Sequence, residues 1–222
     1  MNGPHNSIGW CDYTLNPVKG ICPMKCQYCY AIRMSQRFQR DPTIRFDSKV
    51  LKEPERVKKP ARIFVGSTME LFADEIEDEW LVQIFEMVKR CNWHAFLFLS
   101  KLPWMMSQWD WDLSNAWVGT TVERGEALRR VPWLRKMKIP PVRFVSFEPL
   151  HSDIVKDYRE FQGIDWLIIG AETGNRKGRI VPKEAWIQSI LKLADRLKIP
   201  VFMKDNLKPY WHGSLRQEFP ST

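Results

Sequence analysis

Long apolar runs are missing from this sequence: no stretch reaches the ~18 consecutive apolar residues that a membrane-spanning helix needs. The first seven residues, Met-Asn-Gly-Pro-His-Asn-Ser, contain no basic region followed by an apolar one, the pattern of a secretory signal. Histidine is scarce and scattered, at positions 5, 94, 151 and 212, and we assign none of the four to a metal. These absences predict a cytoplasmic protein that does not associate with membranes.

Cysteine is too sparse for a disulfide framework. The chain has five, an odd number, and three of them fall within residues 22–29. Small secreted domains use paired cysteines as staples, whereas clustered cysteines elsewhere more often bind metal or take part in catalysis. Cys91 stands apart at the end of an expected helix and fits a buried, idle thiol. The cluster of Cys22, Cys26 and Cys29 is therefore the first candidate for chemistry.

The rest of the composition is that of an ordinary globular protein. With 222 residues, 44% hydrophobic and 27% charged, the chain can bury a sizeable core, and we expect a single domain over 1–222. The net charge of +8 is uneven, because residues 1–62 carry 12 Lys and Arg against 5 Asp and Glu. This basic first third could attract a polyanion such as a nucleic acid, or it could be a solvated helical face.

Strands and helices alternate along most of the chain. A short strand and turn at 8–21 lead into the cysteine loop (residues 22–29), and residues 30–40 have helical spacing. Further strands are expected at 62–66, 94–100, 116–123, 141–149, 165–172 and 200–205, with helices at 77–91, 124–138 and 183–197. Shorter helical pieces are expected near 49–58 and 103–112, and the tail at 207–222 is expected to be loosely ordered.

This alternation predicts an α/β fold. Repeated strand–helix units with continuous apolar strands form a parallel sheet that is covered by helices. A complete eight-fold barrel usually needs ~250 residues. We therefore expect a partial (β/α)6-type, TIM-like barrel with parallel strands.

The expected strands end in polar residues. Ligands of parallel α/β folds bind at the carboxyl ends of the strands, so we expect one site assembled from many strands. Any single Ser or Thr at such a place also fits the N-cap of the next helix. The candidate cofactor-binding residues are Tyr28 in the cysteine loop and, at the strand ends, Ser67, Thr68, Glu70, Ser100, Lys101, Thr121, Glu123, Ser146, Glu148 and Glu172.

The cysteine loop has C-x3-C-x2-C spacing, with Tyr28 just before its last cysteine. Three thiolates on one short loop can bind three irons of a cubane cluster and leave the fourth iron open to a small ligand. The stretch resembles the cysteine signature of radical S-adenosylmethionine (SAM) enzymes. A closed site is the alternative, because a structural zinc needs four ligands and Cys11 could be the fourth.

The resemblance extends over roughly residues 8–207. It is to a radical-SAM-like family that is often found in phage and prophage genomes. The matching pieces are Trp10, Asp12, Thr14, Asn16-Pro17-Val18, Gly20, Tyr30-Ala31, Ser67-Thr68-Met69-Glu70-Leu71-Phe72, Leu99-Ser100-Lys101, Trp117-Val118-Gly119, Thr121-Val122-Glu123, Arg143-Phe144, Ser146-Phe147-Glu148-Pro149-Leu150, Asp165-Trp166, Gly170-Ala171-Glu172-Thr173-Gly174 and Lys204-Asp205-Asn206-Leu207.

Three positions depart from the family's common pattern. Many members have a longer gap between the first two cysteines, whereas the gap of three here is standard for radical SAM enzymes and strengthens the cluster assignment. Leu15 stands where a tryptophan is common. Cys11 stands where a residue without a thiol is common, which keeps its role as a fourth ligand open.

The resemblance implies a [4Fe-4S] cluster on Cys22, Cys26 and Cys29, with SAM on the fourth iron. It implies Tyr28 near the adenine, the 67–70 stretch at the methionine amino group, Thr121 and Glu123 facing the ribose, and Ser146 and Glu148 facing the ribose or the substrate. One electron, from a donor such as flavodoxin or ferredoxin, would cleave SAM to methionine and a 5′-deoxyadenosyl radical that abstracts a substrate hydrogen.

The substrate class is a further expectation. A nucleobase, DNA or RNA is favoured by the phage association and the basic first third. The alternative function is a non-enzymatic nucleic-acid-binding protein with a structural zinc or a closed cluster. A third interpretation is a degenerate barrel that acts only as a scaffold. The convergent polar strand ends argue against it, because a scaffold needs no such site.

Overall fold

Strands and helices alternate in the computed structural model, which describes residues 1–3, 6–138 and 140–221. The strands of the main sheet are β1 (Tyr13–Leu15), β4 (Arg62–Val65), β5 (Ala95–Ser100), β6 (Ala116–Thr121), β7 (Val142–Phe147), β8 (Trp166–Ile169) and β9 (Val201–Met203). The α-helices are α1 (Tyr30–Arg37), α2 (Asp78–Arg90), α3 (Pro103–Met106), α4 (Val131–Lys136) and α5 (Glu184–Leu197). The 3₁₀ helices cover Ser48–Lys52, Pro54–Arg56, Gly125–Arg130, Tyr158–Phe161 and Asp205–Tyr210.

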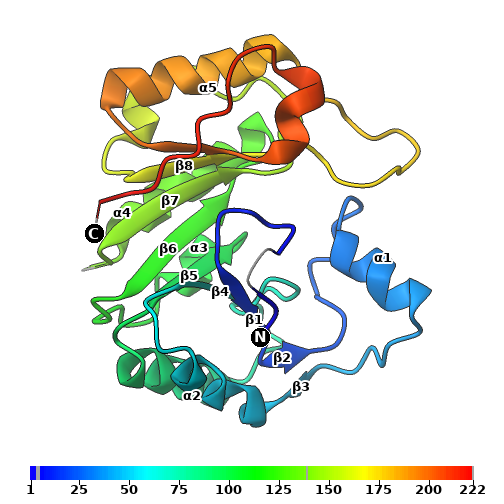
Figure 1. The fold of residues 1–222 in the computed structure, drawn as a ribbon, viewed down its shortest axis with the longest axis vertical. Helices are drawn as coiled ribbons and strands as arrows, with labels where there is room; N and C mark the ends of the chain where they lie inside the picture. The colour runs from blue at the N-terminus through cyan, green and yellow to red at the C-terminus, as the bar shows by residue number, and fades with distance from the viewer. Residues whose placement is uncertain (4–5, 139, 222) are drawn as a thin grey trace.

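The seven strands pair in the order β1-β4-β5-β6-β7-β8-β9, and each neighbouring pair is parallel. The sheet curls into a half-barrel whose edge strands are β1 and β9 (Figure 1). Helices α2 and α5 cover its outer side, whereas α1 stands apart on the side of the cysteine loop (Figure 1). The predicted partial barrel of parallel strands is thus confirmed. Among the described helices, none is long and apolar enough to cross a membrane.

Apolar residues line both faces of the sheet, as parallel strands that are covered on both sides require. The outer cluster lies between the sheet and its helices and includes Phe98, Val118 and Ile169. The inner cluster fills the concave side and consists of Trp10, Cys11, Phe64, Leu97, Trp117, Val142, Phe144, Trp166, Ile168 and Phe202. It forms a mostly aromatic floor below the carboxyl ends of the strands.

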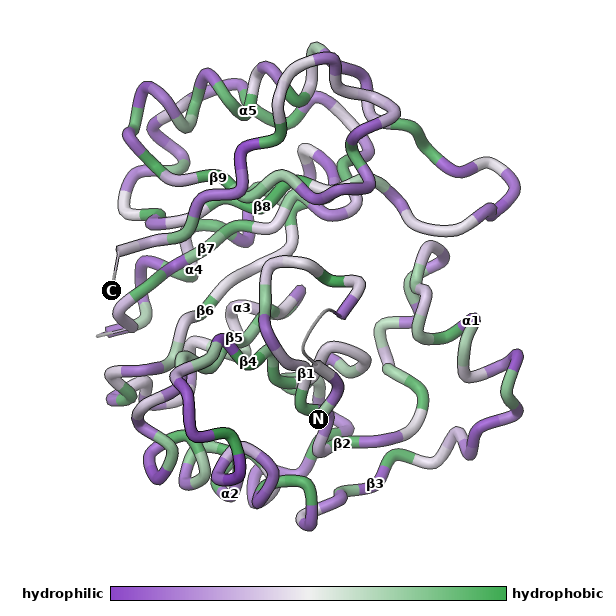
Figure 2. The backbone as a smooth tube through the Cα atoms, viewed as in Figure 1, coloured by the Kyte–Doolittle hydropathy of each residue, from purple (hydrophilic) through white to green (hydrophobic). Residues whose placement is uncertain are grey.

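Helix α2 shows how the sequence sets this packing. Leu81, Ile84 and Val88 recur at helical spacing and are buried against the sheet. Asp78 in the first turn and Arg90 in the last complement the helix dipole. The same alternation of apolar and polar residues is visible along α2 and α5 in Figure 2.

Two details differ from the expected elements. The helix expected at 124–138 is a 3₁₀ helix followed by α4, because Pro132 has no N–H and starts a new helix better than it continues one. The chain also forms a small antiparallel pair, β2 (Val18–Lys19) with β3 (Arg45–Phe46), that was not expected. This pair joins β3, which follows the cysteine loop, to β2, which precedes the loop.

The tail corrects the expectation of loose order at 207–222. The backbone N–H of Met203 donates to the carbonyl of Arg216 at 2.7 Å, and that of Glu218 donates to the carbonyl of Val201 at 2.9 Å. Phe219 then packs on Trp166, with ring centroids 5.5 Å apart. The tail is ordered because it satisfies the backbone groups at the free edge of β9 and covers the inner cluster.

Candidate functional site

The cysteine loop lies between β2 and α1 at the carboxyl ends of the strands. Its last turn is closed by a hydrogen bond from the backbone N–H of Cys29 to the carbonyl of Cys26 at 3.0 Å, and α1 begins at the next residue. Cys22 accepts a hydrogen bond on its sulfur from the backbone N–H of Glu70 at 3.3 Å. All three cysteines are unbridged and half-buried. The loop therefore presents three thiols at the mouth of the half-barrel.

The donor set of the loop fits an iron–sulfur cluster. Such clusters are held by cysteine thiolates, each on its own iron, and are tuned by hydrogen bonds to sulfur such as the one from Glu70. Burial raises the pKa of Cys22, and the amide hydrogen bonds from Met24 and Glu70 oppose the rise. Within residues 1–3, 6–138 and 140–221, no three His, Cys, Asp or Glu side chains converge on a single metal ion, and a cubane does not require this because each thiolate binds its own iron.

Glu70 connects the cysteine loop to β5. One carboxylate oxygen accepts a hydrogen bond from the Ser100 hydroxyl at 2.7 Å, and the other accepts from the backbone N–H of Lys101 at 2.7 Å. Burial raises the pKa of this carboxyl, and the two donors oppose the rise. Glu70, the end of β5 and the loop that carries Cys22 therefore form one hydrogen-bonded unit.

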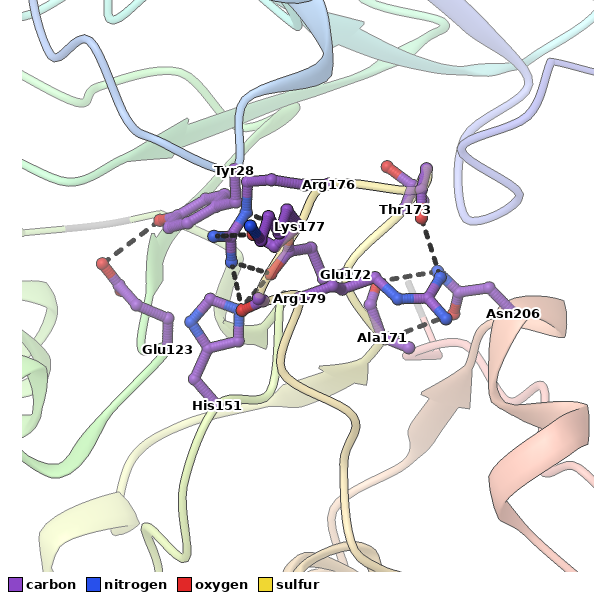
Figure 3. Close-up of polar contacts among 12 residues, drawn as sticks. Tyr28, Glu123, His151, Ala171, Glu172, Thr173, Arg176, Lys177, Arg179 and Asn206 are labelled. Atoms are coloured by element: carbon purple, nitrogen blue, oxygen red, sulfur yellow. Dashed lines mark hydrogen bonds and ion pairs between the residues drawn. The ribbon is translucent and has the colours of Figure 1, made fainter.

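Tyr28 lies next to Glu123 and His151 at the polar strand ends (Figure 3). Its hydroxyl donates to Glu123 at 3.3 Å, and the Lys101 ammonium lies 5.4 Å from its ring centroid. The edge of its ring meets the His151 ring with centroids 5.2 Å apart. The cysteine loop is thus fixed against strand ends β5, β6 and β7 by one aromatic side chain.

Glu123 lies between two cations just after β6. Arg130 donates to one carboxylate oxygen at 2.7 Å, and the Lys101 ammonium is 3.9 Å from the other. Burial acts to raise the pKa of Glu123, but Lys101 and Arg130 outweigh it and hold the pKa below its ordinary value. The carboxylate is therefore ionised at neutral pH and is already oriented.

A second buried carboxylate, Glu172, follows β8. Arg176 donates to both of its oxygens, at 2.7 and 3.0 Å, and His151 Nε2 lies 3.0 Å from one of them (Figure 3). The hydrogen bonds from Arg176 lower the pKa of Glu172, whereas burial lowers the pKa of His151. His151 is therefore neutral near pH 7, and Arg176 balances the charge of Glu172.

The inner wall of the barrel turns polar above the aromatic floor. Thr121 and Ser146 pair across β6 and β7, and the Ser146 hydroxyl is buried without a hydrogen-bond partner among the described residues. Glu148, one step further along the wall, forms an ion pair with Lys204. Gly170 makes room for that pair, because an added Cβ would lie 2.9 Å from Lys204 Cδ. The wall therefore offers a hydroxyl without a partner beside a fixed ion pair.

Two of the candidate residues, Ser67 and Thr68, bond to Asn16, which directly follows β1. The Asn16 amide donates to the Ser67 hydroxyl at 3.0 Å and its oxygen accepts from the Thr68 backbone N–H at 3.3 Å. The Ser100 hydroxyl is directed at Glu70 and at the backbone N–H of Leu102. These contacts hold the turns after β4 and β5, and direct cofactor contacts of Ser67, Thr68 and Ser100 stay predictions.

Cys11 belongs to the inner cluster. Its thiol lies 3.7 Å from the side-chain oxygen of Asn6, and burial raises its pKa to about 12. A neutral thiol in an apolar cluster is a poor ligand, since metals bind the thiolate. Cys91 is buried in the outer cluster.

Three residues of the site, Arg130, His151 and Arg176, were not predicted from the sequence. His151 had a usable signal, because it follows the same strand end as Glu148. Arg130 and Arg176 had none, since each stands in an arginine-rich segment and only the fold shows which arginine reaches a carboxylate.

Comparison with known proteins places the chain in a family and a fold. The family described as "Protein of unknown function (DUF5131)" matches residues 5–213. A mutant of spore photoproduct lyase with dinucleoside spore photoproduct is similar in structure, with a TM-score of 0.64, 11% identity, and coverage of 95% of this chain and 78% of that one. Another mutant of that lyase, with bound AdoMet and dinucleoside spore photoproduct, has a TM-score of 0.57, 10% identity, and coverage of 87% and 76%. No curated protein matched the chain.

Proposed function

The chain belongs to the DUF5131 family of proteins of unknown function and has a radical-SAM-like partial barrel, and from this we propose that it is a radical SAM enzyme. The observation that carries the proposal is the three-thiol loop at the mouth of that barrel, joined by Glu70 and Tyr28 to polar strand ends. One structure with the same fold contains bound AdoMet, which is consistent with SAM as the co-substrate.

In this proposal Cys22, Cys26 and Cys29 would hold a [4Fe-4S] cluster, and SAM would bind to that cluster. Together they supply, when bound, the reductive cleavage of SAM and a radical that abstracts hydrogen from the substrate. The chain's own residues bind and orient SAM and the substrate. The aromatic floor closes the bottom of the half-barrel, so the reacting groups are kept from water on that side.

Each polar group on the wall has a defined task in this proposal. Glu123, ionised between Lys101 and Arg130, accepts hydrogen bonds from ligand hydroxyls, which suits a ribose. Tyr28 positions the loop and presents its ring to a flat base. The Ser146 hydroxyl without a partner is available to a ligand, and the Lys204–Glu148 pair beside it offers one donor and one acceptor.

The substrate in this proposal contains a nucleobase, as a nucleotide, DNA or RNA. The support is the concentration of basic residues beside the cysteine loop and the dinucleoside bound by the structurally similar lyase. A flavodoxin or ferredoxin would supply the electron. Among the described residues no contact favours the closed zinc site, since the Cys11 thiol packs in the inner cluster beside Asn6.

Anaerobic reconstitution with iron and sulfide tests the cluster. We expect a brown protein with about four irons per chain, whose reduced EPR spectrum changes when SAM is added. Cys26→Ala should lose the cluster, whereas the matched control Cys91→Ser should keep it. Cluster retention in Cys26→Ala, or metal release in Cys11→Ala, would contradict the proposal.

A further inference from the structure

The net charge of the chain is concentrated in two short segments. Residues 21–40, which include the cysteine loop and α1, carry four cations and no Asp or Glu. Residues 173–183, which connect β8 to α5, carry four cations and again no acidic residue. The two segments together account for the whole formal charge of +8, so the other residues balance to zero. Each of the two segments is therefore basic and contains no acidic residue to neutralise it.

The two segments meet in space. Arg33 on α1 donates to the carbonyl of Thr173 at 2.9 Å. Gly174 lies against the same guanidinium, because a Cβ added there would be 2.9 Å from Arg33 Nη2. The connection from β8 extends toward α1 in Figure 1. We call this joint surface, residues 21–40 with 173–183, the basic rim, and it includes the cysteine loop.

Several cations of the basic rim are free to bind a ligand. Lys25, Arg37, Arg40 and Lys177 are exposed, and none of them forms an ion pair with a described residue. Arg176 differs, since its charge is taken up by Glu172. Exposed cations that lack acidic partners repel one another and favour an anionic ligand.

Exposed apolar side chains lie beside these cations. Tyr30 and Met34 on α1 and Phe38 at its C-terminal cap follow one another at four-residue spacing, and they are 39%, 40% and 59% exposed. The guanidinium carbons of Arg37 and Arg40 each lie 5.7 Å from the centroid of the Phe38 ring. The exposed Phe38 ring thus lies beside two guanidinium groups.

We propose that the basic rim binds an unpaired strand of nucleic acid. Arg37, Arg40 and Lys177 take phosphates, and a base stacks on Phe38. Single-strand binding sites combine a basic track with aromatic stacking in this way, and stacking requires bases that are not paired in a duplex. This proposal rests on the proposed function, because it names an unpaired strand as the form of the substrate. The strand bound to the basic rim would pass the mouth of the barrel.

Fluorescence anisotropy with a labelled single-stranded DNA oligonucleotide of mixed sequence tests the proposal, using the reconstituted protein at several salt concentrations. Removing two phosphate contacts in Arg37→Gln/Arg40→Gln should weaken binding and reduce the slope of log K against log salt by about 1.4. Phe38→Ala should weaken binding about tenfold with an unchanged slope, since it removes stacking and no charge. The matched control Lys89→Gln/Lys192→Gln removes two exposed cations on α2 and α5 and should bind like the wild type.

The competing partners give different outcomes. Equal loss in the control and rim variants, or no effect of Phe38→Ala, would overturn the proposal, as would duplex DNA or anionic phosphatidylserine vesicles binding more tightly than the single strand. SAM cleavage by the wild-type protein is measured in parallel. If SAM is cleaved but strand binding does not depend on the basic rim, only the proposal for the basic rim is overturned. If strand binding depends on the basic rim but SAM is not cleaved, the proposal for the rim is supported and the radical SAM proposal is overturned.

Discussion

Replacement of Glu70 tests the hydrogen-bonded unit that links the cysteine loop to β5. In Glu70→Ala the Ser100 hydroxyl and the Lys101 backbone N–H both lose acceptors at 2.7 Å. A buried donor left unpaired costs about 1–3 kcal/mol, so the free energy of unfolding should fall by about 2–4 kcal/mol. Glu70→Gln keeps one oxygen acceptor and should lose about 1 kcal/mol.

The pH dependence of the Glu70→Gln deficit gives a sharper test. Burial raises the pKa of Glu70 above its ordinary value of 4.5, so the folded protein holds this proton more tightly than the unfolded chain. The stability from Glu70 is therefore fully present below the ordinary pKa and is lost as pH rises through the raised pKa. Glutamine has no such proton, so its deficit relative to the wild type should be larger at acidic than at neutral pH.

Urea unfolding followed by circular dichroism measures the stability of both variants at an acidic and at a neutral pH, in the same cofactor state as the wild type. The exposed Glu75 in the same segment supplies a matched control, and Glu75→Gln should change stability by less than about 0.5 kcal/mol. A Glu70→Ala variant as stable as the wild type would refute the reasoning, and so would a Glu70→Gln deficit that grows as the pH rises.

Two further substitutions test the packing and the charges of the site. Gly119→Ala would place a methyl group 2.5 Å from the Phe144 ring, and this overpacking of the inner cluster should cost about 1–3 kcal/mol in urea unfolding. Arg130→Gln removes the cation nearest to the Glu123 carboxylate, leaves Lys101 and the Tyr28 hydroxyl beside it, and should cost about 2 kcal/mol at neutral pH. Because the folded pKa of Glu123 is lowered, that loss should shrink as pH falls below the ordinary carboxyl pKa.

Matched controls keep these results interpretable. Gly125→Ala meets nothing within 4 Å of its new Cβ and should leave stability unchanged or slightly raised. Arg129→Gln removes an exposed arginine next to Arg130 and should have no pH-dependent effect. A Gly119→Ala variant as stable as Gly125→Ala, or an Arg130→Gln loss that persists at acidic pH, would contradict the account of the site.

Local patterns were enough for the main elements of the fold. Continuous apolar runs such as 166–169 predict buried parallel strands, and the order of strands and helices then leaves few topologies. The tail was wrongly expected to be loose because its order depends on β9, whose free edge is a feature of the assembled sheet.

The site was less predictable than the fold. Ser100 and Lys101 are adjacent in sequence, yet the alternation at the end of the strand sends their side chains to different faces, so the Ser100 hydroxyl reaches Glu70 and the Lys101 ammonium reaches Glu123. The pairing of Glu123 with Arg130 and of Glu172 with Arg176 depends on side-chain reach after folding, which no local pattern encodes. The proximity of the three cysteines could be predicted without knowledge of the fold, because they share one short loop.

Formation of 5′-deoxyadenosine from SAM, measured by liquid chromatography and mass spectrometry, is the most direct test of a radical SAM site in this barrel. The reconstituted wild-type protein, reduced with dithionite, should release 5′-deoxyadenosine and methionine. Cys26→Ala should release neither, and Cys91→Ser should match the wild type. A cluster-loaded wild-type protein that leaves SAM intact, or a Cys26→Ala variant that cleaves it equally well, would contradict the assignment of the cysteine loop.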